Sequence, residues 1–240
     1  QHLCQGFGRV TTRGSQTEYV EFLKGDKPKD EQDIFSGINT TWNRLKNGGE
    51  IGEILYDIEA DFDFVNPSKH LPKLLDAYKK VQQLEDKHWR TIKEKQILTI
   101  IEACAGLYLE ASAESSSTTP NSTFEVDFEV LNRSEINANL KSITLLPSNK
   151  IIEKNIDLSD NKRINFKETI SITDVNYTSP YWLNDKATLG MYHVENQNLI
   201  GKPETPRVAK VEFLMNINNQ NITFTKEVVH RYSERDKGEI

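Results

Sequence analysis

The sequence predicts an α+β protein in which an N-terminal helical segment is followed by an antiparallel immunoglobulin-like β-sandwich. Apolar residues recur at helical spacing over the first part of the chain, and the period changes to two from Leu107 onward. Roughly seven short strands then follow without an intervening helical pattern, which favours an antiparallel sandwich over a parallel sheet. We therefore expect a helical region at 26–105 and a sandwich at 106–240.

The helical region is expected to contain four amphipathic helices. The first spans 34–45 and ends at the Gly48-Gly49 pair, and the second covers 51–62 with one apolar stripe. A third begins at Asn66-Pro67, because asparagine is a frequent N-cap and proline fits the first helical position. The fourth runs over 87–104. Each helix must bury its apolar stripe against another element.

The clearest strand of the second region is 124–130, where Phe and Val alternate with Glu and Asp. The last two strands are typical of a hairpin closed by 218–221. A closed β-barrel is the alternative arrangement, and the Cys and Trp pattern of antibody domains is missing. The other expected strands are 107–113, 140–146, 151–158, 163–172, 209–217 and 222–232.

The charge balance and hydropathy exclude some partners. The 240 residues carry a formal net charge of -6 without a basic stripe, which argues against a nucleic-acid partner. The longest strongly apolar stretch, 97–109, is interrupted by Glu102 and is shorter than the roughly 20 residues needed to cross a bilayer. We therefore expect no membrane span. The chain starts at Gln1 without a targeting segment, and we expect it to have been cut from a longer protein.

The acidic run Asp57, Glu59, Asp61 and Asp63 is the first candidate for chemistry. Asp57 and Asp61 share a helix face at i, i+4, which invites an interpretation as metal ligands or paired carboxylates. The ligand spacing of a calcium-binding EF-hand is missing, because aromatic residues interleave with the acids. We therefore favour a solvated helix face.

The other polar residues show no catalytic pattern. The five histidines are scattered without zinc-ligand spacing, and no G-x-S-x-G nucleophile is present. Gly6-Phe7-Gly8 lacks the third glycine of a dinucleotide loop. Cys4 and Cys104 have neither redox nor metal-ligand spacing and are expected to be free thiols. We expect no catalytic residue, metal ligand or cofactor in this chain.

An aromatic cluster, Tyr177, Tyr181, Trp182 and Tyr192, is the most informative feature of the second half. Flat amphipathic rings could stack on sugar faces, which makes these residues a candidate glycan site. The alternative is that they clamp a long inter-strand loop to the sandwich. N-x-S/T sequons, which matter in a glycosylating host, occur at Asn39, Asn121, Asn132, Asn176 and Asn221.

The opening segment, residues 1–8, resembles the end of the deacetylase domain of PIG-L/LmbE-like N-deacetylases. His2 and Gln5 match the family's H-x-S-Q, with Cys4 where serine is usual. The resemblance continues over 12–19 and along the chain to large exported bacterial members, which carry a helical region and a β-domain after the catalytic part. The further segments that carry it are 105–111, 177–183 and 199–206.

This resemblance implies a zinc-dependent parent enzyme in which a metal-bound water attacks the acetamide carbonyl of an amino sugar or a related amide. The A-H-P-D-D-E and H-x-x-H motifs that hold the metal are not in this chain. Zinc is therefore implied for a catalytic domain outside it. Residues 1–25 would close that domain, and His2, Gln5 and Arg13 would lie near its substrate cleft or cap it. The resemblance also implies export to the periplasm or the cell surface.

Three functions remain open from the sequence. The first is a non-catalytic accessory region, whose helices pack against its own N-terminal catalytic domain and whose sandwich binds carbohydrate or another protein. The second is a structural spacer or dimerisation domain without a ligand. The third is an independent hydrolase that uses the acids of 57–63.

Overall fold

A computed structural model of the chain describes residues 14–30, 32–173 and 175–239. The chain divides into two compact units, Gln1–Thr40 and Thr41–Ile240, and each is described by itself. Among its described residues the first unit contains turns, bends and extended segments but no helix or strand. Among the residues that the structure describes, all helices and strands lie in the second unit.

The helix predicted over 34–45 does not form, so this prediction was wrong. The Asp33 carboxylate accepts a hydrogen bond from the backbone N–H of Phe35 at 2.9 Å, and Gly37 has a φ of 92°. A side chain that binds nearby backbone competes with the helical ladder, and a left-handed residue interrupts it. Phe35 is consequently 68% exposed. Only Trp42–Arg44 forms a short 3-10 helix, η2.

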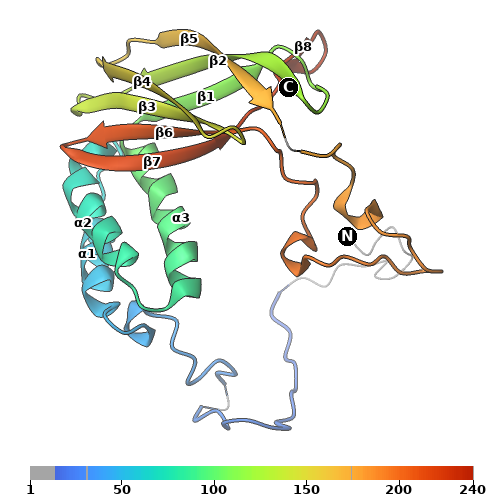
Figure 1. Ribbon diagram of the computed structural model, residues 1–240. Coiled ribbons are helices and arrows are strands. Elements are labelled where there is room, and N and C mark those ends of the chain that lie inside the picture. The colour runs from blue at the N-terminus through green and yellow to red at the C-terminus, as the bar shows by residue number, and fades with distance from the viewer. Residues whose placement is uncertain (1–13, 31, 174, 240) are drawn as a thin grey trace. The chain divides into compact units, whose positions relative to one another are not determined.

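The other three predicted helices are confirmed (Figure 1). They are α1 over Gly49–Ala60, α2 over Leu71–Gln82 and α3 over Lys87–Cys104. Gly48, expected to end a helix, instead precedes α1 as its N-cap. A Cβ atom at Gly48 would lie 2.3 Å from the carbonyl oxygen of Trp42, so only glycine lets η2 and α1 approach this closely.

Local signals set the beginnings of the next two helices. Pro67 opens a 3-10 helix, η3 (Pro67–His70), directly before α2. The Asp86 carboxylate caps α3 by accepting the N–H of Trp89 at 3.0 Å. None of the described helices is long and apolar enough to cross a membrane. The apolar face buried in this region comprises Ile51, Ile58, Leu71, Leu74, Leu75, Ala77, Tyr78, Val81, Leu84, Ile97 and Ile101.

The strands of the second half form two antiparallel sheets. One has the order β1-β2-β5 and the other the order β4-β3-β6-β7. Every predicted strand is present, but the strand predicted over 222–232 ends at Glu227, and the other bounds shift by a few residues at most. A short pair, β8 (Ser233–Glu234) and β9 (Gly238–Glu239), follows. The bounds are β1 Leu107–Ala113, β2 Ser122–Asn132, β3 Ala138–Leu146, β4 Lys150–Asp157, β5 Ile164–Ile172, β6 Lys210–Ile217 and β7 Gln220–Glu227.

The predicted hairpin of the last two long strands is confirmed, with a tighter turn than expected. Ile217 pairs with Gln220, so the loop consists of Asn218 and Asn219. Their φ angles are 49° and 66°, which gives the two left-handed residues of a type I′ turn. Asparagine tolerates this conformation better than other residues that carry a Cβ atom. The turn twists in the direction that the paired strands require.

The two sheets share one apolar core, which confirms the α+β class and the antiparallel arrangement. Phe128 of β2 and Phe213 of β6 meet edge to face with ring centroids 6.0 Å apart. At one edge, Lys154 of β4 pairs with Glu168 of β5 at 2.8 Å and lies 3.9 Å over the Phe166 ring. Side chains thus connect β4 to β5, which belong to different sheets.

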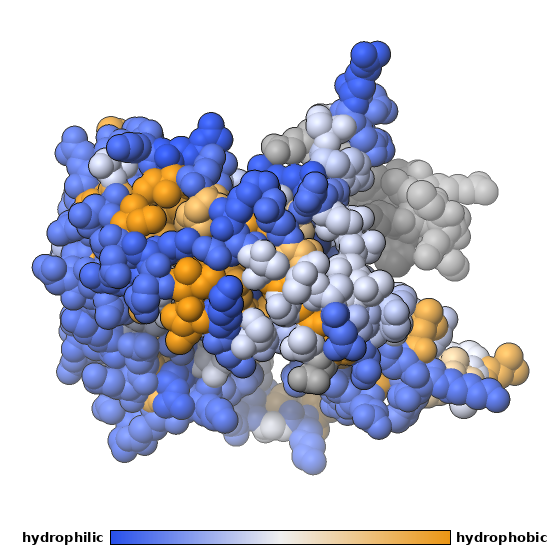
Figure 2. Space-filling view, turned by 45° about the horizontal axis from the view of Figure 1, so that its top comes forward, coloured by the Kyte–Doolittle hydropathy of each residue, from blue (hydrophilic) through white to orange (hydrophobic). Residues whose placement is uncertain are grey.

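The helices are joined to the two sheets on the side where β6 and β7 lie (Figure 1). The Ser134 hydroxyl donates to the carbonyl of Ala105, just past α3, at 2.6 Å. The Arg133 N–H donates to the Gly106 carbonyl at 2.9 Å. The loop between β2 and β3 therefore binds the short link between α3 and β1, where the sequence changes from helical to strand spacing. On the face shown in Figure 2, apolar residues form small groups within a largely hydrophilic surface.

Candidate ligand pocket

The residues that the family resemblance implicates at the start of the chain, His2, Gln5 and Arg13, lie outside the described residues, as does Cys4. Cys104 is a buried free thiol at the end of α3. Burial raises the pKa of the Cys104 thiol, which disfavours a reactive thiolate. Its role is therefore in packing.

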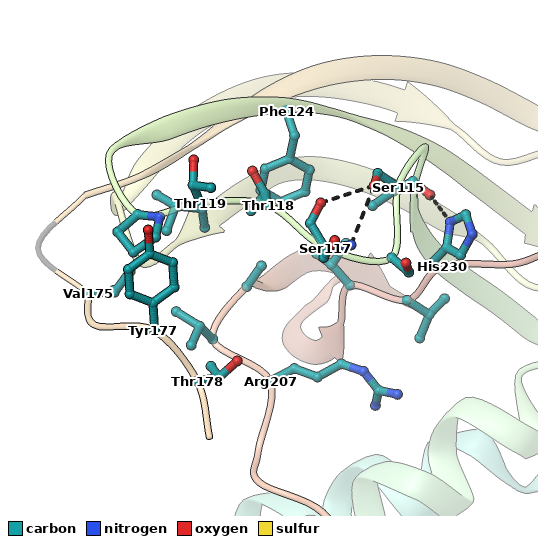
Figure 3. Close-up of a pocket in the computed structure, with 18 of the residues that line it drawn as sticks. Ser115, Ser117, Thr118, Thr119, Phe124, Val175, Tyr177, Thr178, Arg207 and His230 are labelled. Atoms are coloured by element: carbon teal, nitrogen blue, oxygen red, sulfur yellow. Dashed lines mark hydrogen bonds between the residues drawn. The ribbon is translucent and has the colours of Figure 1, made fainter. Parts of the chain in front are cut away.

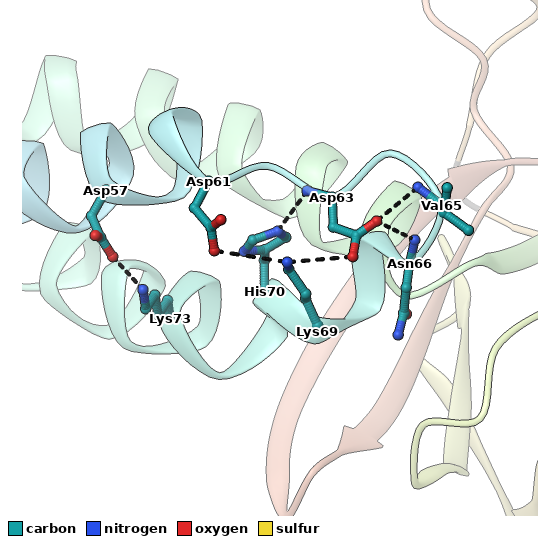
Figure 4. A network of polar contacts seen from close by, with 8 residues as sticks. All are labelled: Asp57, Asp61, Asp63, Val65, Asn66, Lys69, His70 and Lys73. Carbon is teal, nitrogen blue, oxygen red and sulfur yellow. Dashed lines mark hydrogen bonds and ion pairs between the residues drawn. The ribbon is translucent and has the colours of Figure 1, made fainter.

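The acidic run 57–63 begins in the second half of α1 and extends past its end. Lysines from η3 and α2 balance the negative charge of three of its carboxylates (Figure 4). Asp57 pairs with Lys73. Lys69 lies 3.7 Å from the Asp61 carboxylate and 3.3 Å from that of Asp63. The exposed carboxylates thus tie α1 to the following helices, as expected for a solvated face. The arrangement is a cross-link between helices.

Asp63 organises the turn that follows α1. Its carboxylate accepts the N–H groups of Val65 and Asn66, both at 2.9 Å. These two backbone donors, chiefly Asn66, and then Lys69 hold the pKa of the Asp63 carboxyl below its usual range. The Asp63 N–H donates to Nε2 of the buried His70 at 3.0 Å, so His70 serves as a structural acceptor.

The other histidines with defined contacts are separate from one another. His193 Nδ1 lies 3.2 Å from the exposed carboxylate of Asp185, and His230 Nδ1 lies 3.0 Å from the Ala113 carbonyl oxygen. Within residues 14–30, 32–173 and 175–239, no three His, Cys, Asp or Glu side chains are grouped so that they could hold a metal ion.

The four aromatic residues predicted as a cluster do not form one platform. Tyr181 is buried, its hydroxyl donates to the Lys202 carbonyl at 3.0 Å, and its ring meets Trp182 edge-on at 4.8 Å. Tyr177 and Tyr192 are 76% and 60% exposed. Neither makes a ring contact within the described part of the chain. The structure brings together only Tyr181 and Trp182.

These aromatic residues belong to the long connection between β5 and β6, which contains the 3-10 helices η4 (Tyr181–Leu183) and η5 (Gln197–Leu199). The Thr205 hydroxyl donates to the Ser179 carbonyl at 2.7 Å and accepts the Tyr181 N–H at 3.0 Å. These bonds pin the two arms of the connection to each other. Loops of this length in compact domains are commonly functional.

A pocket of about 590 Å³ lies at the end of the two sheets where both arms of this connection meet the β1–β2 loop and the segment after β7 (Figure 3). In Figure 3, Tyr177 and Thr119 lie at one end and His230 lies at the other, with Arg207 along one side. A volume of this size suits a small ligand. Binding sites are often formed by loops that a rigid scaffold of strands positions.

The pocket places hydroxyl groups beside an aromatic ring. The run 115–119 supplies consecutive Ser and Thr side chains, and Asn176 and Thr178 add an amide and a further hydroxyl. The Ser115 hydroxyl donates to the Ser117 carbonyl at 3.0 Å, which closes a local turn. Apolar side chains such as Phe124 line the same pocket. The combination suits a ligand with many hydroxyl groups and one apolar face.

Of the candidate site residues predicted from the sequence, only Tyr177 lines this pocket. His230 was counted among the scattered histidines. An uninterrupted series of hydroxyl residues between two strands was the available signal. Trp182 borders a neighbouring hollow with Pro180 and Pro203 instead.

Comparison with known proteins adds little. No family model and no curated protein matches the sequence. Among solved structures the chain is similar to a Pseudomonas fluorescens alkylpurine DNA glycosylase, AlkC, bound to DNA containing an abasic site analog, with 10% identity and a TM-score of 0.23. The match covers 73% of this chain and 50% of that chain, so this chain spans about half of that protein's length. A likeness of this degree carries no argument about fold or function.

Proposed function

We propose that this chain is the non-catalytic C-terminal accessory region of an exported PIG-L/LmbE-like zinc-dependent de-N-acetylase, and that its sandwich is an immunoglobulin-like carbohydrate-binding module. The observation that carries the binding role is the loop-end pocket, in which the Tyr177 ring lies near the hydroxyl run 115–119. The strand order β1-β2-β5 against β4-β3-β6-β7 supports an immunoglobulin-like sandwich, because seven antiparallel strands divide between two facing sheets.

The Tyr177 side chain is available for sugar binding because it takes no part in the packing of the protein. Its ring is 76% exposed, and within the described residues it makes no ring contact and no side-chain hydrogen bond. An exposed ring next to hydroxyl donors and acceptors can stack on the apolar face of a pyranose while the hydroxyls bind its rim. The pocket therefore offers both contacts that saccharide binding needs.

The first unit supports attachment to a larger domain. Tyr19, Val20 and Leu23 are 92%, 74% and 86% exposed, and their segment forms neither helix nor strand. Apolar side chains exposed in succession are typical of surfaces that a partner covers. In the proposed parent enzyme these residues would pack into the catalytic domain, which would supply the zinc and its activated water.

Binding is tested by a glycan array followed by calorimetric titration of the chain and two matched variants. Tyr177→Ala should weaken binding about two- to tenfold, since one stacking ring contributes about 0.5–1.5 kcal/mol. Tyr192→Ala is the control, because Tyr192 is also exposed on the β5–β6 connection but does not line the pocket. Equal effects of the two substitutions, or no saccharide binding at all, would overturn the glycan-binding role.

The enzyme connection is tested independently by reading the gene upstream of Gln1 and assaying the longer product for zinc-dependent deacetylation. An upstream sequence without the A-H-P-D-D-E and H-x-x-H motifs would refute it. A second test is hydrogen exchange of residues 19–23, whose amides should become protected in the longer protein.

A structural spacer is the second candidate, and one observation favours it. Tyr181 and Thr205 bind the two arms of the β5–β6 connection to each other, which is the clamping role expected of buried aromatic residues. Under this alternative, Trp182→Ala lowers stability without any effect on ligands. The paired Tyr177 and Tyr192 titrations distinguish the two candidates.

A further inference from the structure

We infer that the saccharide site continues from the loop-end pocket into a second hollow beside Trp182, so that its ligand is an oligosaccharide long enough to occupy both; this inference rests on the proposed glycan-binding role. The second hollow has a volume of about 360 Å³. Both arms of the β5–β6 connection form it. Its lining consists of Thr178, Ser179, Pro180 and Trp182 from the first arm and of residues 203–207 from the second.

The loop-end pocket and the second hollow share part of their walls. Thr178, on the first arm, and Arg207, on the second arm, line both of them. In Figure 3 these two side chains lie on the lower side of the loop-end pocket, with Ser117 and Thr118 above them. Because two hollows that share lining residues adjoin each other, a ligand that leaves the loop-end pocket past Thr178 and Arg207 enters the second hollow.

Arg207 is held in position at this boundary. Its Nη1 donates to a carboxylate oxygen of Glu227 at 3.0 Å, and its Nη2 lies 3.9 Å from a carboxylate oxygen of Glu204, which lines the second hollow. The Arg207 side chain is nevertheless half exposed. A guanidinium has five N–H donors in one plane, and the hydrogen bond to Glu227 uses one of them. Arg207 can therefore donate to the oxygens of a saccharide that crosses the boundary.

The second hollow combines an aromatic ring with hydroxyl groups, as the loop-end pocket does. Trp182 is partly exposed, and its ring meets the buried Tyr181 ring edge to face with centroids 4.8 Å apart. Pro180 and Pro203 extend the apolar surface, and the hydroxyl of Thr205 lies in the same lining. An indole offers a large flat surface on which the apolar face of a pyranose can stack. The hollow is therefore suited to a further sugar unit of the same ligand.

The two arms that form the second hollow are fixed to each other. The Thr205 hydroxyl donates to the Ser179 carbonyl at 2.7 Å and accepts the Tyr181 N–H at 3.0 Å. The Tyr181 hydroxyl donates to the Lys202 carbonyl at 3.0 Å. A binding surface that is already ordered loses less conformational entropy when a ligand binds. The hydrogen bonds that clamp the connection therefore also preorganise the second hollow.

The first measurement follows affinity against ligand length. Cellobiose to cellohexaose, and the N-acetylchitooligosaccharides of the same lengths, are titrated calorimetrically against the full chain. When a ligand becomes long enough to reach Trp182, its affinity should rise about two- to tenfold, which corresponds to one more stacked ring. Longer ligands also gain affinity because they can bind in more registers. Variants are therefore needed to assign the gain to the second hollow.

Trp182→Ala should weaken binding of the longest ligands about two- to tenfold and leave the affinity of the shortest ligand that binds unchanged. Tyr177→Ala should weaken binding at every length, because each ligand occupies the loop-end pocket. Leu183→Ala is the matched control, since Leu183 follows Trp182 in η4 and is 54% exposed but lines neither hollow. It should change no affinity.

A loss of folding does not imitate this result, because it would weaken binding of short and long ligands alike. Trp182→Phe keeps an aromatic ring and should recover most of the affinity for long ligands. Thermal unfolding of each variant verifies that it is folded at the temperature of the titration.

The outcomes separate the inference from the proposal beneath it. If Trp182→Ala weakens every bound length equally, or none, the second hollow is not part of the site and the inference fails, while the loop-end pocket remains a saccharide site. Failure of both oligosaccharide series to bind would also overturn the inference. The glycan-binding role itself falls only if the glycan array shows no ligand either.

Discussion

Glu102 of α3 and Lys226 of β7 form an ion pair, with the Lys226 Nζ atom 2.6 Å from a carboxylate oxygen of Glu102. The pair joins the helical region to the four-stranded sheet across 124 positions of sequence. The side chains are only 19% and 31% exposed, respectively. Water therefore screens this pair less than an ion pair on an open surface.

We predict that Lys226→Met lowers the free energy of unfolding by about 1–2 kcal/mol, because it leaves a largely buried carboxylate without its partner. Urea denaturation measures the loss, and the Glu102→Gln/Lys226→Met double variant should recover part of it. Lys167→Met is the control, since Lys167 pairs with Glu125 on an exposed sheet face and should contribute less than about 1 kcal/mol. Equal losses for the two lysines would contradict the prediction.

Two phenylalanines test where the core lies. Phe213→Ala should reduce the free energy of unfolding by about 3–5 kcal/mol, because it opens a cavity between the two sheets. Phe35→Ala should change it by less than about 0.5 kcal/mol, because the predicted helix is absent and this ring is exposed. Thermal and urea unfolding of both variants provide the measurement. A large loss in Phe35→Ala would mean that this segment has a packed partner.

The acid sensitivity of the turn after α1 follows from Asp63. Its folded pKa is lowered by the N–H groups of Asn66 and Val65 and by Lys69, so between the folded and unfolded pKa values the unfolded chain binds more protons. The stabilisation from ionised Asp63 is therefore present above the unfolded pKa of about 3.9 and is lost as the pH falls through the folded value.

The corresponding variant is Asp63→Asn, which keeps an acceptor oxygen but loses the charge. It should be less stable than the unaltered chain at neutral pH, and the difference should shrink on acidification. Urea midpoints measured from about pH 7 to pH 2 follow this change. Glu59→Gln, on the exposed part of α1, controls for the general effect of removing a negative charge. A difference for Asp63→Asn that does not depend on pH would refute the assignment.

Asn132 shows that a sequon can be structural. It is fully buried, and its amide donates to the carbonyls of Leu158 at 3.2 Å and Ile136 at 3.4 Å. Its side-chain oxygen accepts the N–H of Ser134 at 3.0 Å. A glycan on this nitrogen would remove one of its two N–H donors and could not fit into the core.

In a glycosylating host, peptide mass spectrometry should therefore find Asn132 unmodified, while the exposed sequon at Asn121 can carry a glycan. Asn132→Leu should lower the free energy of unfolding by about 2–3 kcal/mol, because three backbone groups lose their partner. Asn121→Gln is the control, although its φ of 61° makes a small loss expected there too. Glycan occupancy at Asn132 in folded protein would contradict the buried position.

The sequence predicted most of the secondary structure because the relevant signals are local. Alternation in 124–130 and the paired strands around Asn218 and Asn219 reflect strand periodicity and turn chemistry, and both elements are present. The α3 bounds, Lys87–Cys104, were also predictable, because the Asp86 cap and the apolar spacing agree. The helix predicted over 34–45 was the exception. Its apolar residues have helical spacing, but the hydrogen bond from the Phe35 N–H to the Asp33 carboxylate and the left-handed conformation of Gly37 prevent a helix there.

By itself the sequence determined that the helices precede the strands and which strand residues alternate between the two faces of a sheet. It also determined that the catalytic motifs of the resembled family are not present in this chain. Those properties depend on residues close in the chain. Only the tertiary structure decided which ring of the predicted aromatic cluster lines a pocket, because Tyr177, the run 115–119 and His230 line the same pocket only after two sheets and a long connection have packed. It also decided that Tyr181 is a buried clamp. Tertiary packing sets how deeply a side chain is buried and which distant residues it contacts. The spacing of residues along the chain does not specify either.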